Sequence, residues 1–234
     1  MNQMVYKGGG IVTDVDVKTR TVSGYFSVFG NKDSDGQVID HGAYTKTIAE
    51  WGPAGKNRIM HLWMHKTDKI LSKPRELDED TRGLKFISQF PVDEAKQTPL
   101  QSDVIKLYDQ GVLTEHSVGF QVVKNRIDDE IEHLTEVRLW EGSTVTWGAN
   151  EQAKVTEVKS EQKPELIDRM SRLIKAIRDG RFCDDTFYML EYELTIIKTQ
   201  LDSLEQKEPV IVPLPEVIEP DYEAILKLFK SKLK

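Results

Sequence analysis

Two patterns of hydrophobic spacing divide this chain. Up to about residue 155, short runs alternate apolar and polar residues, as strands with one buried face do. From about residue 160 onward, apolar residues recur every three or four positions, which is the spacing of one face of a helix. The sequence therefore predicts a part that is mostly β with helices, followed by a C-terminal helical extension.

The first part has turn residues between runs that are rich in Val, Thr and Gly. Helices are expected at residues 44–50 and 98–111. Strands are expected at residues 11–17, 21–28, 58–65, 84–90, 113–120 and 133–155.

The second part is predicted to hold two helices, a linker and a last helix. The first helix, residues 164–177, carries a stripe of Ile167, Met170, Ile174 and Ile177. In the next, which runs to about residue 206, a seam with spacings of three and four is typical of an antiparallel helical hairpin or of a coiled coil between chains. This seam consists of Phe187, Leu190, Leu194, Ile197, Leu201 and Leu204.

Domain boundaries follow from these patterns. Residues 1–158 form the β domain, and residues 159–207 form the helical hairpin or coiled-coil extension. Four prolines make residues 208–220 an extended linker. Residues 221–234 form an amphipathic C-terminal helix, which could dock on a partner.

Composition limits the classes of function and the compartments that the chain fits. The chain has 234 residues and a net charge of −7, and a mildly acidic protein is a poor candidate for binding nucleic acid. Its single cysteine, Cys183, excludes an intrachain disulfide and fits a reducing compartment. Neither a signal peptide nor an apolar run of the ~20 residues that span a bilayer is found, so we expect a cytosolic protein without a membrane segment.

One serine stands out in the predicted strand at residues 113–120. Ser117 and Gly119 lie on its polar face, whereas Val118 and Phe120 lie on its apolar face. A serine in such a position is usually only solvated. Gly119 would leave the backbone open to close approach by another chain.

Two histidines share one face of the predicted strand at residues 58–65. His61 and His65 could bind a metal, but no general-base Glu stands between them, as it does in HExxH enzymes. His65 lies at the strand end, where a side chain can reach both a core wall and a cleft. The residue types leave structural, catalytic and metal-binding roles open.

An acidic residue extends an apolar face in the strand at residues 133–155. By alternation, Glu141 shares a side with Val137 and Leu139, where a carboxylate is costly unless a donor or cation pairs with it. The alternative is a bulge at Gly142 that turns Glu141 to water.

Five segments of the first part stand out when they are taken in chain order. They are GYFSVFGNKDSDGQVIDHGAY, WMHKTDKI, LDEDTRGLKF, LTEHSVGFQV and LTEVRLWEGSTVTWGANEQAKV. Together they resemble the prohead maturation serine proteases of tailed bacteriophages. That family is similar in fold to the herpesvirus assemblins, so the resemblance implies a closed β-barrel flanked by helices.

The resemblance also implies site residues. Ser117 would be the nucleophile, His65 the general base and Glu141 the group that orients the base. His133 and Glu136 remain rivals for the third role.

Two further expectations concern the surroundings of the nucleophile. His116 has the opposite parity to Ser117 and should point away. Backbone N–H groups near Gly148, Ala149 and Asn150 would form the oxyanion hole.

The implied function is a serine endopeptidase that cleaves capsid and scaffold proteins, and itself, inside the viral prohead in the host cytoplasm. It would need no cofactor or metal, and would act as a homodimer or higher oligomer. The alternative is a non-enzymatic capsid assembly or scaffolding protein built on a degenerate protease barrel.

Overall fold

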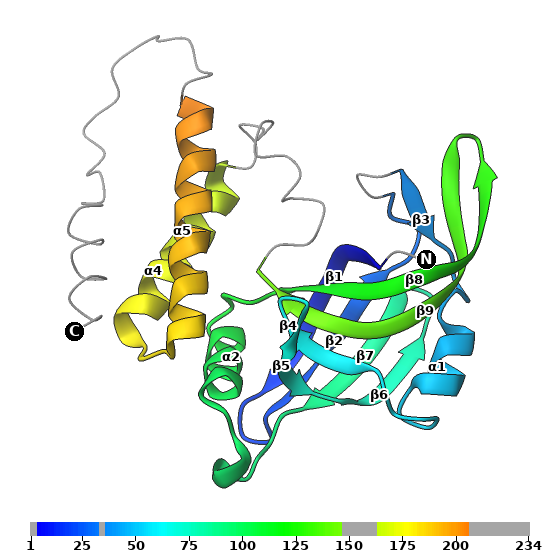
Figure 1. Ribbon diagram of the computed structural model, residues 1–234. Coiled ribbons are helices and arrows are strands. Elements are labelled where there is room, and N and C mark those ends of the chain that lie inside the picture. Colours follow the sequence, from blue (N-terminus) through cyan, green and yellow to red (C-terminus); the bar gives the residue numbers. More distant parts are fainter. Residues whose placement is uncertain (1–3, 33–35, 147–162, 206–234) are drawn as a thin grey trace.

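A single nine-stranded sheet dominates the computed structural model, which describes residues 4–32, 36–146 and 163–205 (Figure 1). The strand order is β5-β4-β9-β8-β1-β2-β7-β6, and β3 pairs with β9. The strands are β1 (Val5–Asp16), β2 (Thr21–Val28), β3 (Gln37–Ile39), β4 (Met60–Trp63), β5 (Lys66–Ser72), β6 (Pro74–Glu79), β7 (Gly83–Gln89), β8 (Glu115–Asp128) and β9 (Ile131–Val145). The prediction of a mostly β protein with helices is confirmed.

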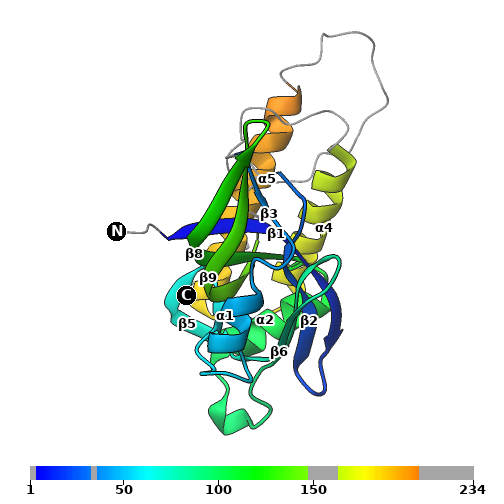
Figure 2. The same ribbon diagram turned by 90° about the vertical axis from the view of Figure 1, so that its right-hand side faces the viewer.

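The sheet is curled but open, so the expectation of a closed barrel is wrong (Figures 1 and 2). The order ends at β5 on one side and β6 on the other, and these two strands do not pair within the described residues. The amide of Gln101, on a helix, donates to the backbone oxygen of Leu71 in β5 at 2.9 Å. A side chain therefore donates to a backbone oxygen of the edge strand β5, which in a closed barrel would pair with another strand.

Two short helices of the first part lie where the sequence predicts them. Helix α1 (Thr45–Trp51) covers the edge of β9 between β3 and β4, where Thr47 Oγ1 accepts from the Leu139 backbone N–H at 3.1 Å. Helix α2 (Pro99–Asp109) begins with a capping box between Thr98 and Gln101. A one-turn 3-10 helix, η1 (Glu94–Lys96), precedes it.

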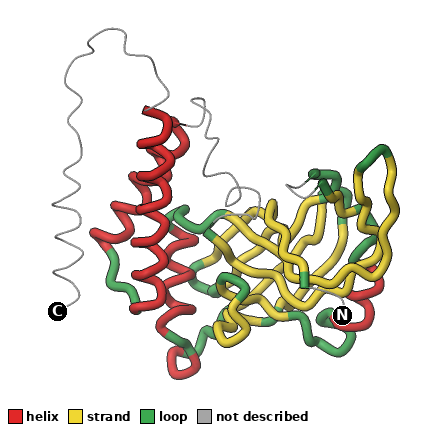
Figure 3. The backbone as a smooth tube through the Cα atoms, turned by 45° about the horizontal axis from the view of Figure 1, so that its top comes forward, coloured by secondary structure: helices red, strands yellow, loops and turns green. Residues whose placement is uncertain are grey.

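The second part forms a helical hairpin that stands at one end of the sheet beside α2 (Figures 1 and 3). It consists of α4 (Lys163–Asp179) and α5 (Asp184–Glu205). Leu190 and Ile197 of the predicted seam are fully buried, so the hairpin within one chain is the arrangement observed. The linker and last helix predicted at 208–220 and 221–234 lie outside the described residues, as does the boundary near 158.

The predicted stripe of α4 is displaced by one residue. Leu166 and Leu173 are buried together with Met170 and Ile177, whereas Ile167 is 44% exposed. The buried face is thus centred on residues 166, 170, 173 and 177, which keeps a helical spacing of four, three and four.

An arginine of α4 joins the hairpin to the sheet. Arg169 binds Glu193 of α5 at 2.9 Å and Glu115 of β8 at 3.3 Å, and it donates to the backbone oxygen of Thr146. Burial raises the pKa of Glu193 to about 7, although Arg169 opposes that rise. Among the described residues, no helix is both long and apolar enough to cross a membrane.

A chain of polar side chains runs through the core. His61 Nε2 lies 2.9 Å from Thr144 Oγ1, and the hydroxyl of Tyr108 lies 2.5 Å from Thr144 Oγ1 and 2.8 Å from His116 Nε2. All four residues are buried, and Phe26 contacts both imidazoles edge-on. Burial lowers the pKa of His116 to about 3 and holds the pKa of His61 well below its usual value.

These depressed pKa values predict that acid destabilises the fold. Below pH 6.5 an unfolded chain binds protons at both imidazoles, whereas the folded chain does not, so the free energy of unfolding should fall as pH drops from 6.5 toward 3. Each histidine contributes a slope of up to about 1.4 kcal/mol per pH unit. Urea unfolding of the wild type and of His116→Gln between pH 7.5 and 5 measures the difference, and equal slopes would contradict the prediction.

Candidate active site

His65 lies in the turn of a tight hairpin. Strand β4 ends at Trp63, which pairs with Lys66 of β5, and the two residues between them have φ values of +53° for Met64 and +58° for His65. A two-residue turn with both φ values positive is of the type I′ class, for which Asn-Gly is the preferred sequence. Non-glycine residues in this conformation cost on the order of 1 kcal/mol each.

The turn separates the two histidines that the sequence placed on one face. His61 stays in the core, whereas His65 leaves the strand alternation at Met64, so the shared face is a wrong prediction. No cluster of three or more His, Cys, Asp or Glu side chains suited to a metal occurs in the part of the chain that the structure describes. The metal alternative therefore has no geometric support.

A bulge decides where Glu141 points. Phe120 of β8 pairs with Leu139 and Gly119 pairs with Glu141, so Trp140 is an extra residue in β9. The bulge ends the alternation that placed Glu141 with Val137 and Leu139, and that prediction is wrong. A bulge at Gly142 that exposes Glu141 is wrong too, because the residue is only 6% exposed.

After the bulge, alternate residues of β9 serve two faces. Gly142 packs against the ring of Phe26 in the core, and Thr144 joins the buried polar chain. Glu141 and Ser143 lie on the opposite side, which we call the site face. They share it with Ser117 and Gly119 of β8, because Ser117 pairs with Ser143 and Gly119 with Glu141.

The carboxylate of Glu141 binds His65. His65 Nδ1 lies 2.7 Å from Glu141 Oε1, and the Ser143 hydroxyl donates to Glu141 Oε2 at 2.6 Å. An ionised carboxylate only accepts hydrogen bonds, so Nδ1 carries the proton and Nε2 of the neutral ring is left as an acceptor. The ring of Tyr6, from β1, lies 4.4 Å from the imidazole and covers it on one side.

Ser117 lies in the middle of the site face, between Gly8 of β1 and Ser143 of β9. It is 1% exposed, and its hydroxyl makes no hydrogen bond within the described residues. His116 points into the core, where Nε2 meets the hydroxyl of Tyr108, so the prediction that it points away from Ser117 is confirmed.

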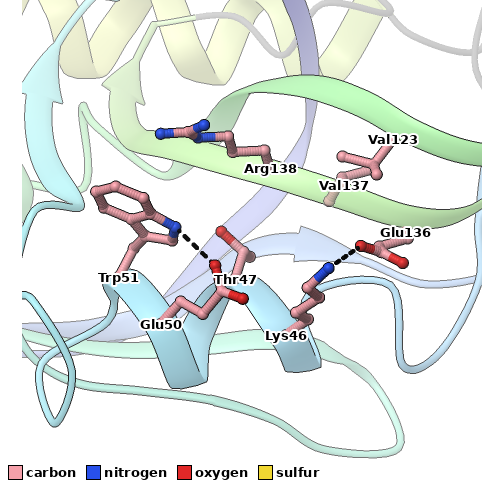
Figure 4. A pocket seen from close by; sticks show the side chains of 8 residues that line it. All are labelled: Lys46, Thr47, Glu50, Trp51, Val123, Glu136, Val137 and Arg138. Carbon is pink, nitrogen blue, oxygen red and sulfur yellow. Dashed lines mark hydrogen bonds and ion pairs between the residues drawn. The ribbon is translucent and has the colours of Figure 1, made fainter.

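The two rivals of Glu141 bind other partners. His133 Nδ1 lies 2.7 Å from Asp40 Oδ1. Glu136 binds Lys46 at 3.0 Å and Lys124 at 2.5 Å, and it lines a separate cavity of about 190 Å³ between α1 and β9 (Figure 4). Within the part of the chain that the structure describes, neither residue makes a hydrogen bond or ion pair with His65. The predicted oxyanion residues Gly148, Ala149 and Asn150 lie outside the described residues.

Gly119 makes room for the acid. A Cβ atom at this position would lie 2.1 Å from Glu141 Oε1 and 3.0 Å from its carboxyl carbon. The sequence predicts that Gly119 lets another chain approach the backbone, whereas in the structure the Glu141 side chain fills this space. Tyr6 and Ser143 also belong to this site, although neither carries a sequence signal apart from strand parity.

We expect Gly119→Ala to displace the Glu141 carboxylate. Overpacking of this kind costs about 1–3 kcal/mol, so the free energy of unfolding should fall by that amount. In a Glu141→Ala background the three nearest atoms to the new Cβ are gone, so the same substitution should cost less than about 0.5 kcal/mol. Urea unfolding of the four variants tests this coupling, and an equal loss in both backgrounds would refute it.

Comparisons with known proteins agree with the resemblance seen in the sequence. The profile of the family described as caudovirus prohead serine protease matches residues 11–166. The prohead protease of Enterobacteria phage HK97 is 31% identical over 161 residues, which cover 65% of this chain and 66% of that protein, just under two thirds of its length. A structure of the bacteriophage T4 capsid assembly protease is similar with a TM-score of 0.47 and 7% identity, over 62% of this chain and 98% of that one.

The family match extends over well more than half of the chain and includes Ser117, His65 and Glu141. The chain belongs to the caudovirus prohead serine protease family.

Proposed function

We propose that this protein is a serine endopeptidase that cleaves capsid precursor and scaffold proteins during prohead maturation. Ser117 is the nucleophile, His65 the general base and Glu141 the acid that orients the base. The observation that carries the proposal is the 2.7 Å contact between His65 Nδ1 and Glu141 Oε1, formed on the sheet face to which Ser117 belongs.

The chemistry of the site follows the acyl-transfer pattern. Ser117 Oγ attacks the carbonyl carbon of the scissile bond and its proton passes to His65 Nε2. When the tetrahedral intermediate collapses, the C–N bond breaks and His65 returns the proton to the leaving amine. A water molecule then attacks the ester, gives a proton to His65, and the acid product leaves as Ser117 recovers that proton.

Glu141 acts through the imidazole. Its hydrogen bond with Nδ1 keeps Nε2 unprotonated and available to Ser117, and its charge stabilises the imidazolium that forms during attack. Among the described residues, the Ser117 hydroxyl makes no hydrogen bond to the His65 ring or to any other group. Such bonds often tighten only when substrate binds.

The other parts of the assignment come from the family. Capsid and scaffold proteins are the substrates, the prohead in the host cytoplasm is the place of action, and the enzyme cleaves itself. We propose backbone N–H groups near Gly148, Ala149 and Asn150 as the oxyanion hole. The protein acts as a homodimer or higher oligomer. Residues 208–234 lie beyond the family match, and we propose from the amphipathic pattern at 221–234 that they dock the protein to the shell or scaffold.

Ser117→Ala should abolish cleavage while the protein stays folded, because only one buried hydroxyl without a hydrogen bond among the described residues is lost.

Glu141→Gln should lower kcat/KM by about 10³-fold or more, since the amide can no longer enforce the tautomer of His65. Both effects can be measured by gel electrophoresis and mass spectrometry of fragments released from the capsid precursor of the same phage.

His133→Gln is the matched control, because this histidine also binds a carboxylate but lies away from the site. It should cleave at the wild-type rate. If a well-folded wild type cleaves neither itself nor its capsid precursor, the non-enzymatic assembly protein becomes the better account.

A further inference from the structure

Ser143 occupies the centre of the site, although the proposed mechanism does not use it. It is fully buried, donates to Glu141 Oε2 at 2.6 Å and accepts from the His65 backbone N–H at 3.1 Å. We propose that Ser143 is a positioning residue that fixes the acid and the base relative to the nucleophile. This inference rests on the proposed function, because it concerns the same site.

The Ser143 hydroxyl has a limited capacity for hydrogen bonds. A serine has a single proton to donate, and here that proton goes to the carboxylate. With Oε1 bound to His65, both oxygens of Glu141 are satisfied and its rotation is blocked. Without Ser143, a nearly buried carboxylate oxygen would lose its donor, which is among the costlier defects in a protein interior.

Ser143 also holds the strained backbone of the base. Met64 and His65 both have positive φ values, and the turn is fastened to β9 at two points. The backbone N–H of Met64 donates to the Thr144 oxygen at 3.0 Å, and that of His65 donates to Ser143 Oγ. One oxygen atom therefore holds both the backbone of the base and the acid that orients its ring.

The register of β8 and β9 relates Ser143 to the nucleophile. Ser143 is the direct cross-strand partner of Ser117, so β8–β9 pairing fixes the position of the nucleophile relative to Ser143. Side chains at such positions start from Cβ atoms about 4.5–5.5 Å apart. The positions of all three members of the proposed triad are thus fixed relative to the side chain of Ser143 in β9.

The structure offers a matched control. Ser88 of β7 is also fully buried, and its hydroxyl has no hydrogen bond among the described residues. Ser88→Ala therefore removes the same atom from a buried strand without removing a hydrogen bond. A general effect of deleting a buried hydroxyl should appear in both variants.

The experiment compares full-length wild type with Ser143→Ala, Ser143→Thr, Ser88→Ala and Ser117→Ala. The first readout is the rate at which a fluorophosphonate labels Ser117, followed by intact mass. The second is the tautomer of neutral His65, read from ¹⁵N chemical shifts of its ring. The second readout needs no nucleophile, so it tests positioning independently of the proposed function.

We expect Ser143→Ala to slow labelling by about 10- to 100-fold, the effect of a displacement near 1 Å, and to yield a mixture of His65 tautomers. Ser143→Thr keeps a hydroxyl and should restore most of the rate and the single Nδ1–H tautomer. Ser88→Ala should match the wild type in both readouts.

The outcomes separate the two proposals. If wild type is not labelled at Ser117 but Ser143→Ala still mixes the tautomers, the nucleophile assignment fails and the positioning role stands. If Ser143→Ala keeps the wild-type tautomer, or if Ser88→Ala slows labelling equally, the positioning role is overturned.

Discussion

The pairing of β8 with β9, including its bulge at Trp140, is the constraint on which the site depends. The extra residue moves Glu141 to the site face and returns Gly142 to the core. Beyond Gly142 the alternation continues: Ser143 lies on the site face beside Glu141, and Thr144 lies in the buried polar chain of the core. A slip of one residue would exchange the two sets and place a carboxylate against the ring of Phe26.

The two faces of β9 differ in the charge of the groups that they carry. On the core side, His61 and His116 are uncharged imidazoles enclosed by aromatic rings and bound to hydroxyls. On the site face, an acceptor-only carboxylate lies between an imidazole and a hydroxyl, both of which donate to it. Uncharged packing under β9 thus supports a carboxylate above it, and this suits the proposed active site, whose groups should be in place before substrate arrives.

The sequence predicts the main secondary-structure elements and names the candidate site residues. It does not predict the bulge and the turn that bring His65 and Glu141 together. Alternation and helical spacing correctly locate α1, α2 and most strands, and motif order brings out Ser117, His65 and Glu141. Alternation fails at Glu141 because a bulge has no reliable sequence signal, and at His65 because Met-His is an uncommon pair for a type I′ turn. The expectation of a closed barrel comes from the family resemblance, and strand patterns alone do not show whether the edge strands β5 and β6 pair.

The β4–β5 hairpin has a consequence for engineering. A designer who seeks only thermal stability would place Asn-Gly at positions 64 and 65, since those residues suit the positive φ values of this turn. The resulting protein would be more stable. On the mechanism proposed above it would also be inactive, because it would lack the general base His65. Robustness and reactivity therefore compete for the same two positions of the chain.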